Sequence, residues 1–130
     1  MAITNYAITA AIEGRRFVKK DASNNTVSYA TENGFDAIGV TANSVSSASF
    51  TAGINQVSVI ELNTVGRVKV EFAGAVTEGG YVGVGANGKA KNMPENATPV
   101  ATNLVGIAEE TGGGDTADSW VIVNKGSYVI

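Results

Sequence analysis

The chain has 130 residues, which is enough for one domain with a hydrophobic core and too few for two. Its net charge of −3 offers no basic face for nucleic acid, and no stretch approaches the roughly 18 apolar residues of a membrane-spanning helix. The sequence contains neither Cys nor His, which excludes disulfides and removes imidazole and thiolate from catalysis and metal binding. We therefore expect no nucleic-acid or membrane partner, no cofactor and no metal site.

The choice of apolar residues predicts the fold class. Counting gives 17 Val and 9 Ile against 2 Leu. β-Branched side chains pack well on pleated surfaces, whereas Leu is the usual residue of helix cores. The 16 Gly residues separate the apolar runs. We predict an all-β protein, a single compact barrel or sandwich of short antiparallel strands with little helix.

The first 14 residues hold Ile3, Ile8 and Ile12 in a background of small and polar residues, without clean helical or strand periodicity. We interpret residues 1–14 as an N-terminal arm or an edge strand, ahead of a single β-domain at 15–130. The segment lacks the basic region that precedes the apolar run of a secretory signal. We therefore expect synthesis in the cytoplasm without secretion.

A basic cluster follows, since Arg15, Arg16, Lys19 and Lys20 are four of the nine basic residues of the chain. The favoured interpretation is the solvated outer face of a strand, and the alternative is a patch that meets an acidic partner. The next predicted elements are a polar turn at 21–26, a return strand at 27–29, an apolar run at 35–40, a Ser-rich loop at 43–49 and a strand at 56–62.

The stretch 66–88 shows the clearest strand pattern. Val68, Val70 and Phe72 alternate with charged residues, which is the period-two pattern of a half-buried strand. Asn87-Gly88 then follows a second apolar run. This dipeptide predicts a hairpin with a type I′ turn, because both central residues of that turn need positive φ.

The remainder of the chain reads as strands separated by loops. Pro94 and Pro99 predict an irregular connection over residues 89–102, because proline has no N–H to donate to a sheet. An apolar run at 104–108, an exposed loop at 111–118, a strand at 120–123 and a final strand at 127–130 complete the chain.

The two halves of the sequence match each other in order. Residues 17–18 align with 81–82, 38–40 with 105–107, 57–59 with 121–123, and 66–70 with 126–130. We predict an internal repeat of residues 15–70 and 79–130, and chance matching of Val-rich strands is the alternative. A half of this size cannot cover its own apolar face, so both halves are expected to pack into one barrel or sandwich.

No motif predicts catalysis. Residues 83–88 fit the dinucleotide pattern G-x-G-x-x-G, but the segment that follows is stopped by Pro94 and is too short for the required helix. The loop at 112–118 contains Asp115 and Asp118, but it has neither the nonapeptide repeat nor the closing Glu of a calcium-binding loop. Glu109 and Glu110 are adjacent and would face opposite sides of a strand. We expect a protein that is not an enzyme.

Several motifs follow one another from residue 66 to the C-terminus. They are the strand VKVEF, the segment AGAVTEG, a Tyr-Val strand, a hairpin ending in NGKA, the segment VGIAEE, a Gly-Asp loop and a final Val/Ile strand. In this order they resemble the capsid decoration, or cement, proteins of tailed phages. The resemblance covers roughly half of the chain directly and the first half through the repeat.

The resemblance implies a virion protein, made in the host cytoplasm, that binds the outer surface of the head and stabilises the lattice by bridging major capsid subunits. It also implies a homo-oligomer, with a trimer favoured over a dimer, and no catalytic residue. We single out these candidate capsid contacts: Ile3, Tyr6 and Ile8 for strand addition, and Arg15, Arg16, Lys19 and Lys20 for an acidic partner. The alternatives are a tail-tube or baseplate β-domain and a carbohydrate-binding surface domain.

Overall fold

The computed structural model describes residues 1–22, 25–112 and 115–130. The predicted all-β fold is confirmed, because the described elements are ten strands with three short helical turns. Five strands form a first sheet: β1 (Ile3–Ala7), β2 (Phe17–Lys20), β3 (Val27–Tyr29), β4 (Ala37–Thr41) and β5 (Gln56–Glu61). Five more form a second sheet: β6 (Arg67–Ala73), β7 (Tyr81–Val84), β8 (Ala90–Asn92), β9 (Ala101–Ala108) and β10 (Asp115–Val129).

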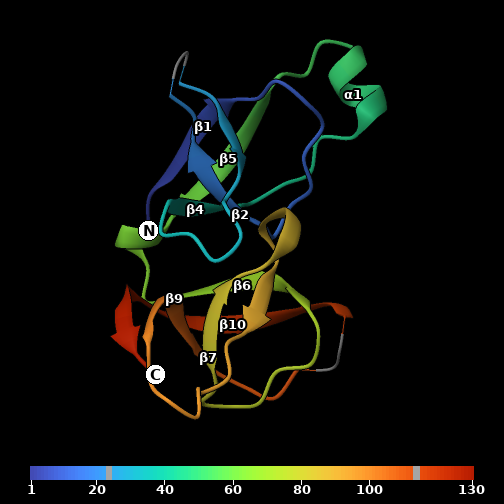
Figure 1. Cartoon of the computed structure of the whole chain (residues 1–130). Coiled ribbons are helices and arrows are strands. Elements are labelled where there is room, and N and C mark those ends of the chain that lie inside the picture. The colour runs from blue at the N-terminus through green and yellow to red at the C-terminus, as the bar shows by residue number, and fades with distance from the viewer. Residues whose placement is uncertain (23–24, 113–114) are drawn as a thin grey trace.

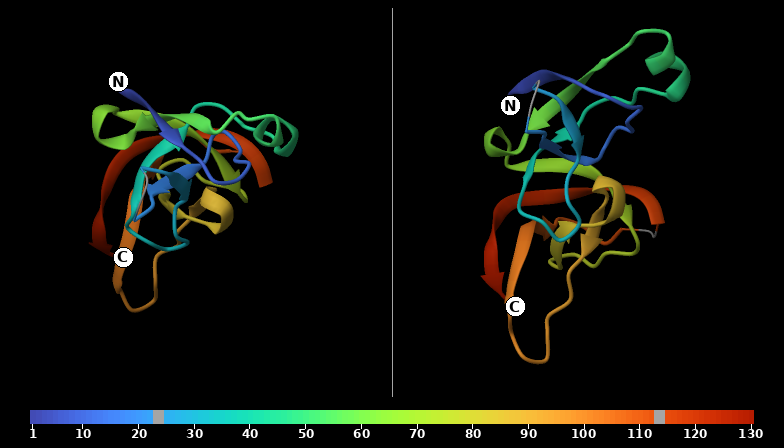
Figure 2. Two further views of the ribbon diagram at one scale, coloured as in Figure 1. Left: turned by 90° about the horizontal axis from the view of Figure 1, so that it is seen from above. Right: turned by 45° about the horizontal axis from the view of Figure 1, so that its top comes forward.

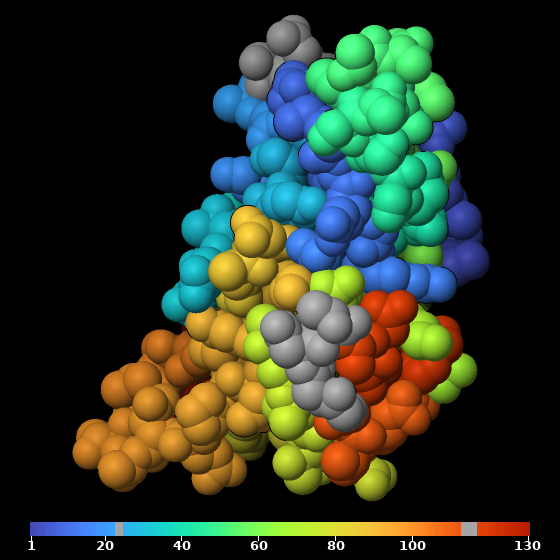
Figure 3. Space-filling view, turned by 90° about the vertical axis from the view of Figure 1, so that its right-hand side faces the viewer, coloured from blue at the N-terminus to red at the C-terminus, as the bar shows by residue number. Residues whose placement is uncertain are grey.

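The two sheets lie one above the other (Figure 1). We call residues 1–65, which hold β1–β5, the first unit, and residues 66–130, which hold β6–β10, the second unit. The connection between β8 and β9, drawn in orange, extends away from the second unit (Figures 2 and 3). No helix within the described ranges is long and apolar enough to cross a membrane.

Both units have the same strand order. The first sheet runs β1-β5-β4-β2-β3, and the second runs β6-β10-β9-β7-β8. In the second unit β8 also pairs with β6 in parallel, at Phe72 and Ala90, and this pair closes a barrel. In the first unit an isolated parallel bridge between Ala7 and Thr26 joins the same two ends. Closure of this kind leaves few free strand edges.

The strand registers also correspond. Val18 lies opposite Gly39 in the first unit, and Val82 lies opposite Gly106 in the second. Both glycines are sites of close approach, because a Cβ at Gly39 or Gly106 would lie 2.5 or 2.0 Å from a carbonyl oxygen of the neighbouring strand. The units therefore share their strand order and the register of this strand pair.

This equivalence divides the chain differently from the predicted repeat. Residues 66–70 were aligned with the last strand, 126–130, but β6 is the first strand of the second unit and corresponds to β1. The prediction failed there because short alternating Val-rich strands match one another in several registers. It follows that Ile3–Ala7 belongs to the first unit as its opening strand, at one end of the sheet.

The Asn-Gly hairpin is confirmed. Strands β7 and β8 pair antiparallel, and η2 (Ala86–Gly88) connects them. Asn87 has φ +55° and Gly88 has φ +71°, as a type I′ turn requires, and the amide of Lys89 donates to the carbonyl of Ala86. This turn packs on the first unit, where a Cβ at Gly88 would lie 2.4 Å from the carbonyl oxygen of Phe17.

Two apolar clusters form the core. One lies within the first unit and contains Val18, Val57 and Val59. The other fills the barrel and continues into the first unit, where it includes Phe17 and Val40. The predicted inward set Val68, Val70 and Phe72 is buried in this second cluster. Burial of shared apolar surface therefore holds the two units together.

One short helix was not predicted. Residues 43–49 were expected to form a loop, but α1 (Ser47–Thr51) begins within this segment. The hydroxyl of Ser46 accepts a hydrogen bond from the amide of Ser49, which caps the helix. A further 3-10 turn, η1 (Leu62–Thr64), ends the first unit. The predicted turn at 21–26 and loop at 111–118 include residues 23–24 and 113–114, which lie outside the described ranges. The loop prediction is wrong for residues 115–118, because β10 begins at Asp115 and pairs with β6 there.

Candidate functional site

Of the three apolar residues predicted as contacts, only Ile3 is exposed. Its side chain lies on β1 and is 54% exposed. Tyr6 and Ile8 are buried in the core of the first unit. Burial, together with the hydrogen bond that its hydroxyl donates to Glu61, raises the pKa of Tyr6 above its ordinary value of 10.0. Tyr6 and Ile8 therefore stabilise the protein itself.

The four basic residues predicted as a single patch have different environments. Arg16 is 5% exposed, whereas Lys20 is exposed and Arg15 and Lys19 are partly exposed. Lys20 borders a cavity of about 330 Å³ that Tyr6 and Lys125 also line. Arg15 has φ +60°, an uncommon conformation for a residue other than glycine. This backbone turn lies immediately before β2, and the two neighbouring side chains differ in their surroundings: Arg15 lines a surface groove and Arg16 is buried.

Arg16 is the centre of a polar junction between the two units. Its Nη1 donates to the carbonyl of Asn87 at 2.9 Å, and its Nη2 pairs with Oε2 of Glu71 at 3.0 Å. Nη2 also contacts the carboxylate of Glu13, and the guanidinium lies 5.6 Å from the ring centroid of Tyr29. Arg16 was predicted as a surface contact, but its side chain is buried and its partners belong to the same chain.

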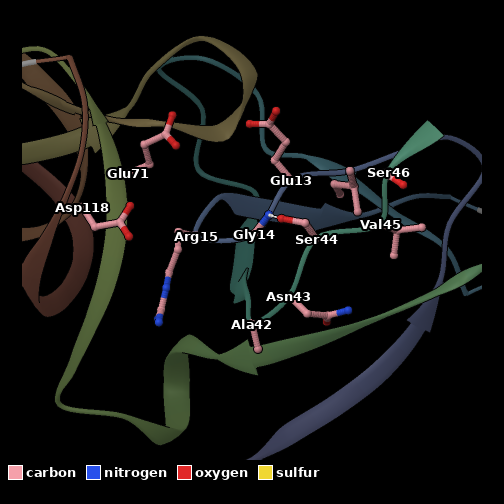
Figure 4. Close-up of a pocket in the computed structure, with 11 residues that line it drawn as sticks. Glu13, Gly14, Arg15, Ala42, Asn43, Ser44, Val45, Ser46, Glu71 and Asp118 are labelled. Atoms are coloured by element: carbon pink, nitrogen blue, oxygen red, sulfur yellow. Dashed lines mark hydrogen bonds between the residues drawn. The ribbon is translucent and has the colours of Figure 1, made fainter. Parts of the chain in front are cut away.

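A groove of about 480 Å³ lies beside this junction, between the two units (Figure 4). Glu71 of β6 and Asp118 of β10 face it from the second unit, and Glu13, Arg15 and residues 42–46 line it from the first. The amide of Gly14 donates to the hydroxyl of Ser44 at 2.8 Å, which holds the two loops of the first unit together.

Two carboxylates that line the groove, Glu13 and Glu71, have defined partners. Glu71 pairs with both Arg16 and Lys89, the latter at 3.3 Å, so its charge is compensated. No cluster of three or more His, Cys, Asp or Glu side chains in the described part of the chain is arranged to hold a metal ion. The arrangement joins the two units and can bind polar groups.

A second surface, not identified from the sequence, covers the outside of the barrel. The register places one outward residue from each of four neighbouring strands in a single row: Arg67, Ile122, Ile107 and Tyr81. Lys69 and Trp120 are paired in the next row along β6 and β10. We call these six residues the barrel face.

Two cations of the barrel face lie over the ring of Trp120. The guanidinium of Arg67 lies 4.1 Å from the ring centroid of Trp120, and the Lys69 ammonium lies 5.9 Å from it. Arg67 also pairs with Oε1 of Glu109 at 2.8 Å. The signal available in the sequence was the alternation on β6, which predicted Arg67 and Lys69 to point outward, but only the fold brings Trp120 beside them.

No protein-family model matches the sequence, and no curated protein matches it either. Among solved structures, the chain is similar to the N base of the head fiber gp8.5 of bacteriophage phi29. The two share a fold. The TM-score is 0.71, and the similarity covers 98% of this chain and 97% of that chain. Sequence identity is 14%, so the likeness concerns the fold.

Proposed function

We propose that this chain is a structural protein of a phage virion that binds the outer surface of the head and stabilises the capsid lattice by bridging major capsid subunits. The observation that carries the proposal is the full-length likeness to the base of a phage head fiber, since both units are matched. The decoration-protein motifs between residue 66 and the C-terminus give independent support.

The proposed mechanism is binding without turnover. A protein that binds only the assembled lattice stabilises it by mass action, and two contacts held in one chain increase avidity. The two units are joined by a shared apolar core and by the Arg16 junction, so their surfaces have a fixed spacing. The partner in this proposal is the major capsid protein, and the binding form is a homo-oligomer, a trimer in preference to a dimer.

The test is to mix the purified protein with heads that lack it. We expect the protein to sediment with the heads at a saturable copy number and to raise their melting temperature. Binding without a rise in melting temperature would contradict lattice stabilisation, and absence of binding would contradict the whole proposal. Assembly into rings or tubes without heads would favour a tail part, and glycan binding would favour a carbohydrate-binding domain.

The predicted role of the N-terminal segment needs a point variant. Deleting residues 1–12 would remove Tyr6, Ile8 and Ile12, which are buried, and would disturb the fold. Ile3→Asp changes only an exposed side chain, and Ile54→Asp is a matched control because both isoleucines are 54% exposed. Weaker binding for Ile3→Asp alone supports strand addition at β1, and equal binding of both variants contradicts it.

A further inference from the structure

Strand β10 extends beyond the barrel that it helps to close. On the side of β6, the amide of Val123 still donates to the carbonyl of Gly66 at 3.0 Å. From there to its end, β10 pairs only with β9 among the strands that the structure describes. We call this two-stranded projection, residues 100–104 and 126–130, the ribbon. It lies at the margin of the molecule, beside the C-terminus (Figures 1 and 2).

The ribbon has no counterpart in the first unit. Val123 of β10 lies opposite Gly106. Glu61 of β5 lies opposite Gly39, the equivalent glycine, so these two positions correspond. Strand β5 ends at Glu61 and the turn η1 follows at once, whereas β10 continues to Val129. The barrel closes through strand pairs outside the ribbon, which is therefore an addition to the repeated fold.

The register of the ribbon fixes which backbone groups of β10 point outward. Val100 and Ile130 exchange two backbone hydrogen bonds, of 3.0 and 3.1 Å, so hydrogen-bonded and non-hydrogen-bonded pairs alternate from there. Ser127 and Val129 belong to non-hydrogen-bonded pairs. Their N–H and C=O groups therefore point away from β9, and no described strand pairs with them on that side. An unpaired edge of this kind can accept another β-strand.

The side chains along this edge are exposed and uncharged. Val129 is 71% exposed, and Tyr128 and Val100 beside it are also exposed. Residues 126–130 include no proline and no charged side chain, which are common means of keeping a strand edge unpaired. Lys125 is the nearest cation, and its ammonium donates to a backbone carbonyl of the first unit at 2.8 Å. The edge is thus open to pairing.

The chemistry of the edge indicates what occupies it. Unpaired N–H and C=O groups match an extended backbone, and neutral side chains allow an identical strand to pair without like-charge repulsion. Tyr128 lies between the two outward residues. Its ring packs over Gly126, where a Cβ would lie 2.8 Å from a ring atom, and its hydroxyl donates to the carbonyl of Asn124. The ring is therefore held on its own strand, where an added strand would meet it.

We propose that the outward edge of β10 at residues 127–129 is the contact between copies of this chain, formed when a second copy adds a β-strand to it. The inference rests on the homo-oligomer of the proposed function and names the contact that forms it. Pairing of β10 with itself across a two-fold axis gives a dimer, and pairing with another edge of the next copy closes a ring such as a trimer. Backbone hydrogen bonds and the apolar contact of Val129 and Tyr128 hold either form together.

The test compares two variants of Val129 with a matched control in the purified protein. Val129→Pro removes an outward N–H and leaves the hydrogen bonds to β9 in place. Val129→Lys keeps the backbone and adds a charge to the edge. Ile54→Lys makes the same change in the first unit, at a side chain that is also more than half exposed. Circular dichroism and melting curves confirm folding, and sedimentation velocity then measures self-association.

We expect the unchanged protein to form a discrete dimer or trimer. Each Val129 variant should weaken self-association by about tenfold or more, because it removes backbone hydrogen bonds or brings like charges together. Ile54→Lys should associate as the unchanged protein does, and added salt should have little effect on a neutral contact. A monomer at every concentration, or equal association of Val129→Lys and Ile54→Lys, would overturn the inference.

Hydrogen exchange of single backbone amides, followed by nuclear magnetic resonance, distinguishes an added strand from a contact between side chains. The amides of Ser127 and Val129 should exchange slowly in the associated protein and rapidly after dilution to the monomer. Rapid exchange in the associated protein would overturn strand addition.

These measurements use no heads, so the two proposals fail separately. An associated protein that does not bind heads would contradict the proposed function and leave this inference standing. A monomer that binds heads would overturn this inference and leave head binding standing.

Discussion

Replacing Arg16 tests whether the polar junction holds the two units together. Arg16→Met keeps the length and the apolar stem of the side chain and removes its charge. The carbonyl of Asn87 then loses a donor at 2.9 Å, and Glu71 loses a partner at 3.0 Å. Removing one member of a buried ion pair costs about 3–5 kcal/mol. Because small domains are stable by only about 5–15 kcal/mol, this is a large share of the free energy of unfolding.

Urea unfolding gives the measurement. Trp120 is the only tryptophan in the chain and lies in the second unit, so its fluorescence reports that unit, while far-ultraviolet circular dichroism reports both. Coincident transitions from the two probes justify a two-state free energy. A loss of less than about 1 kcal/mol for Arg16→Met would refute the reasoning, because a buried pair would then contribute no more than an exposed one.

Glu13→Gln is the matched control. The Glu13 side chain contacts the same guanidinium but is 65% exposed. Exposed ion pairs contribute about 0–1 kcal/mol, because solvent screens the charges. We expect this variant to unfold close to the urea concentration of the unchanged protein. If Glu13→Gln lowered the free energy of unfolding as much as Arg16→Met does, the contact of Arg16 with Glu13, and not its contacts with the second unit, would account for the effect.

Two further substitutions test local structure. Gly88→Ala should lower the free energy of unfolding by about 1–3 kcal/mol, because φ is +71° and the new Cβ would lie 2.4 Å from the Phe17 carbonyl oxygen. Gly74→Ala is the control and should cost far less, because a Cβ at Gly74 would lie in open space. Equal urea midpoints for the two variants would contradict this prediction. Burial opposes ionisation of Asp36, but hydrogen bonds from the hydroxyl and amide of Thr31 outweigh it and lower the pKa below its ordinary 3.8. A lowered carboxyl pKa stabilises the protein above pH 3.8, and that contribution is lost as pH falls through the folded-state value. Asp36→Asn should therefore cost about 1 kcal/mol at neutral pH, with the difference narrowing in acid, and a pH-independent difference would contradict it.

Local sequence patterns predicted two features of the second unit. Alternation identified the inward set Val68, Val70 and Phe72, and Asn87-Gly88 identified the hairpin, because both signals depend on geometry within a few residues. The all-β class followed from composition, because Val and Ile pack well on sheets and far outnumber Leu in this chain. Helix α1 was missed because its five residues contain no buried position and so carry no amphipathic pattern.

The candidate contacts were harder to predict, because burial depends on contacts between distant segments. Arg16 was read as one cation of an exposed run, yet it is buried by Asn87, which lies 71 positions later. The left-handed backbone at Arg15 also prevents the alternation of β2 from being extended backwards. Trp120 and Lys69 become neighbours only through the pairing of β10 with β6.

The anchor for the hairpin turn exists in one unit only. By register, Phe17 corresponds to Tyr81 and the residue before it, Arg16, corresponds to Gly80. Tyr29, which lies against the same guanidinium, corresponds to Asn92. The second unit thus has no equivalent cation or ring with which to receive another hairpin turn. The contact between the units is therefore asymmetric, because the first unit supplies the cation and the ring and the second unit supplies the turn.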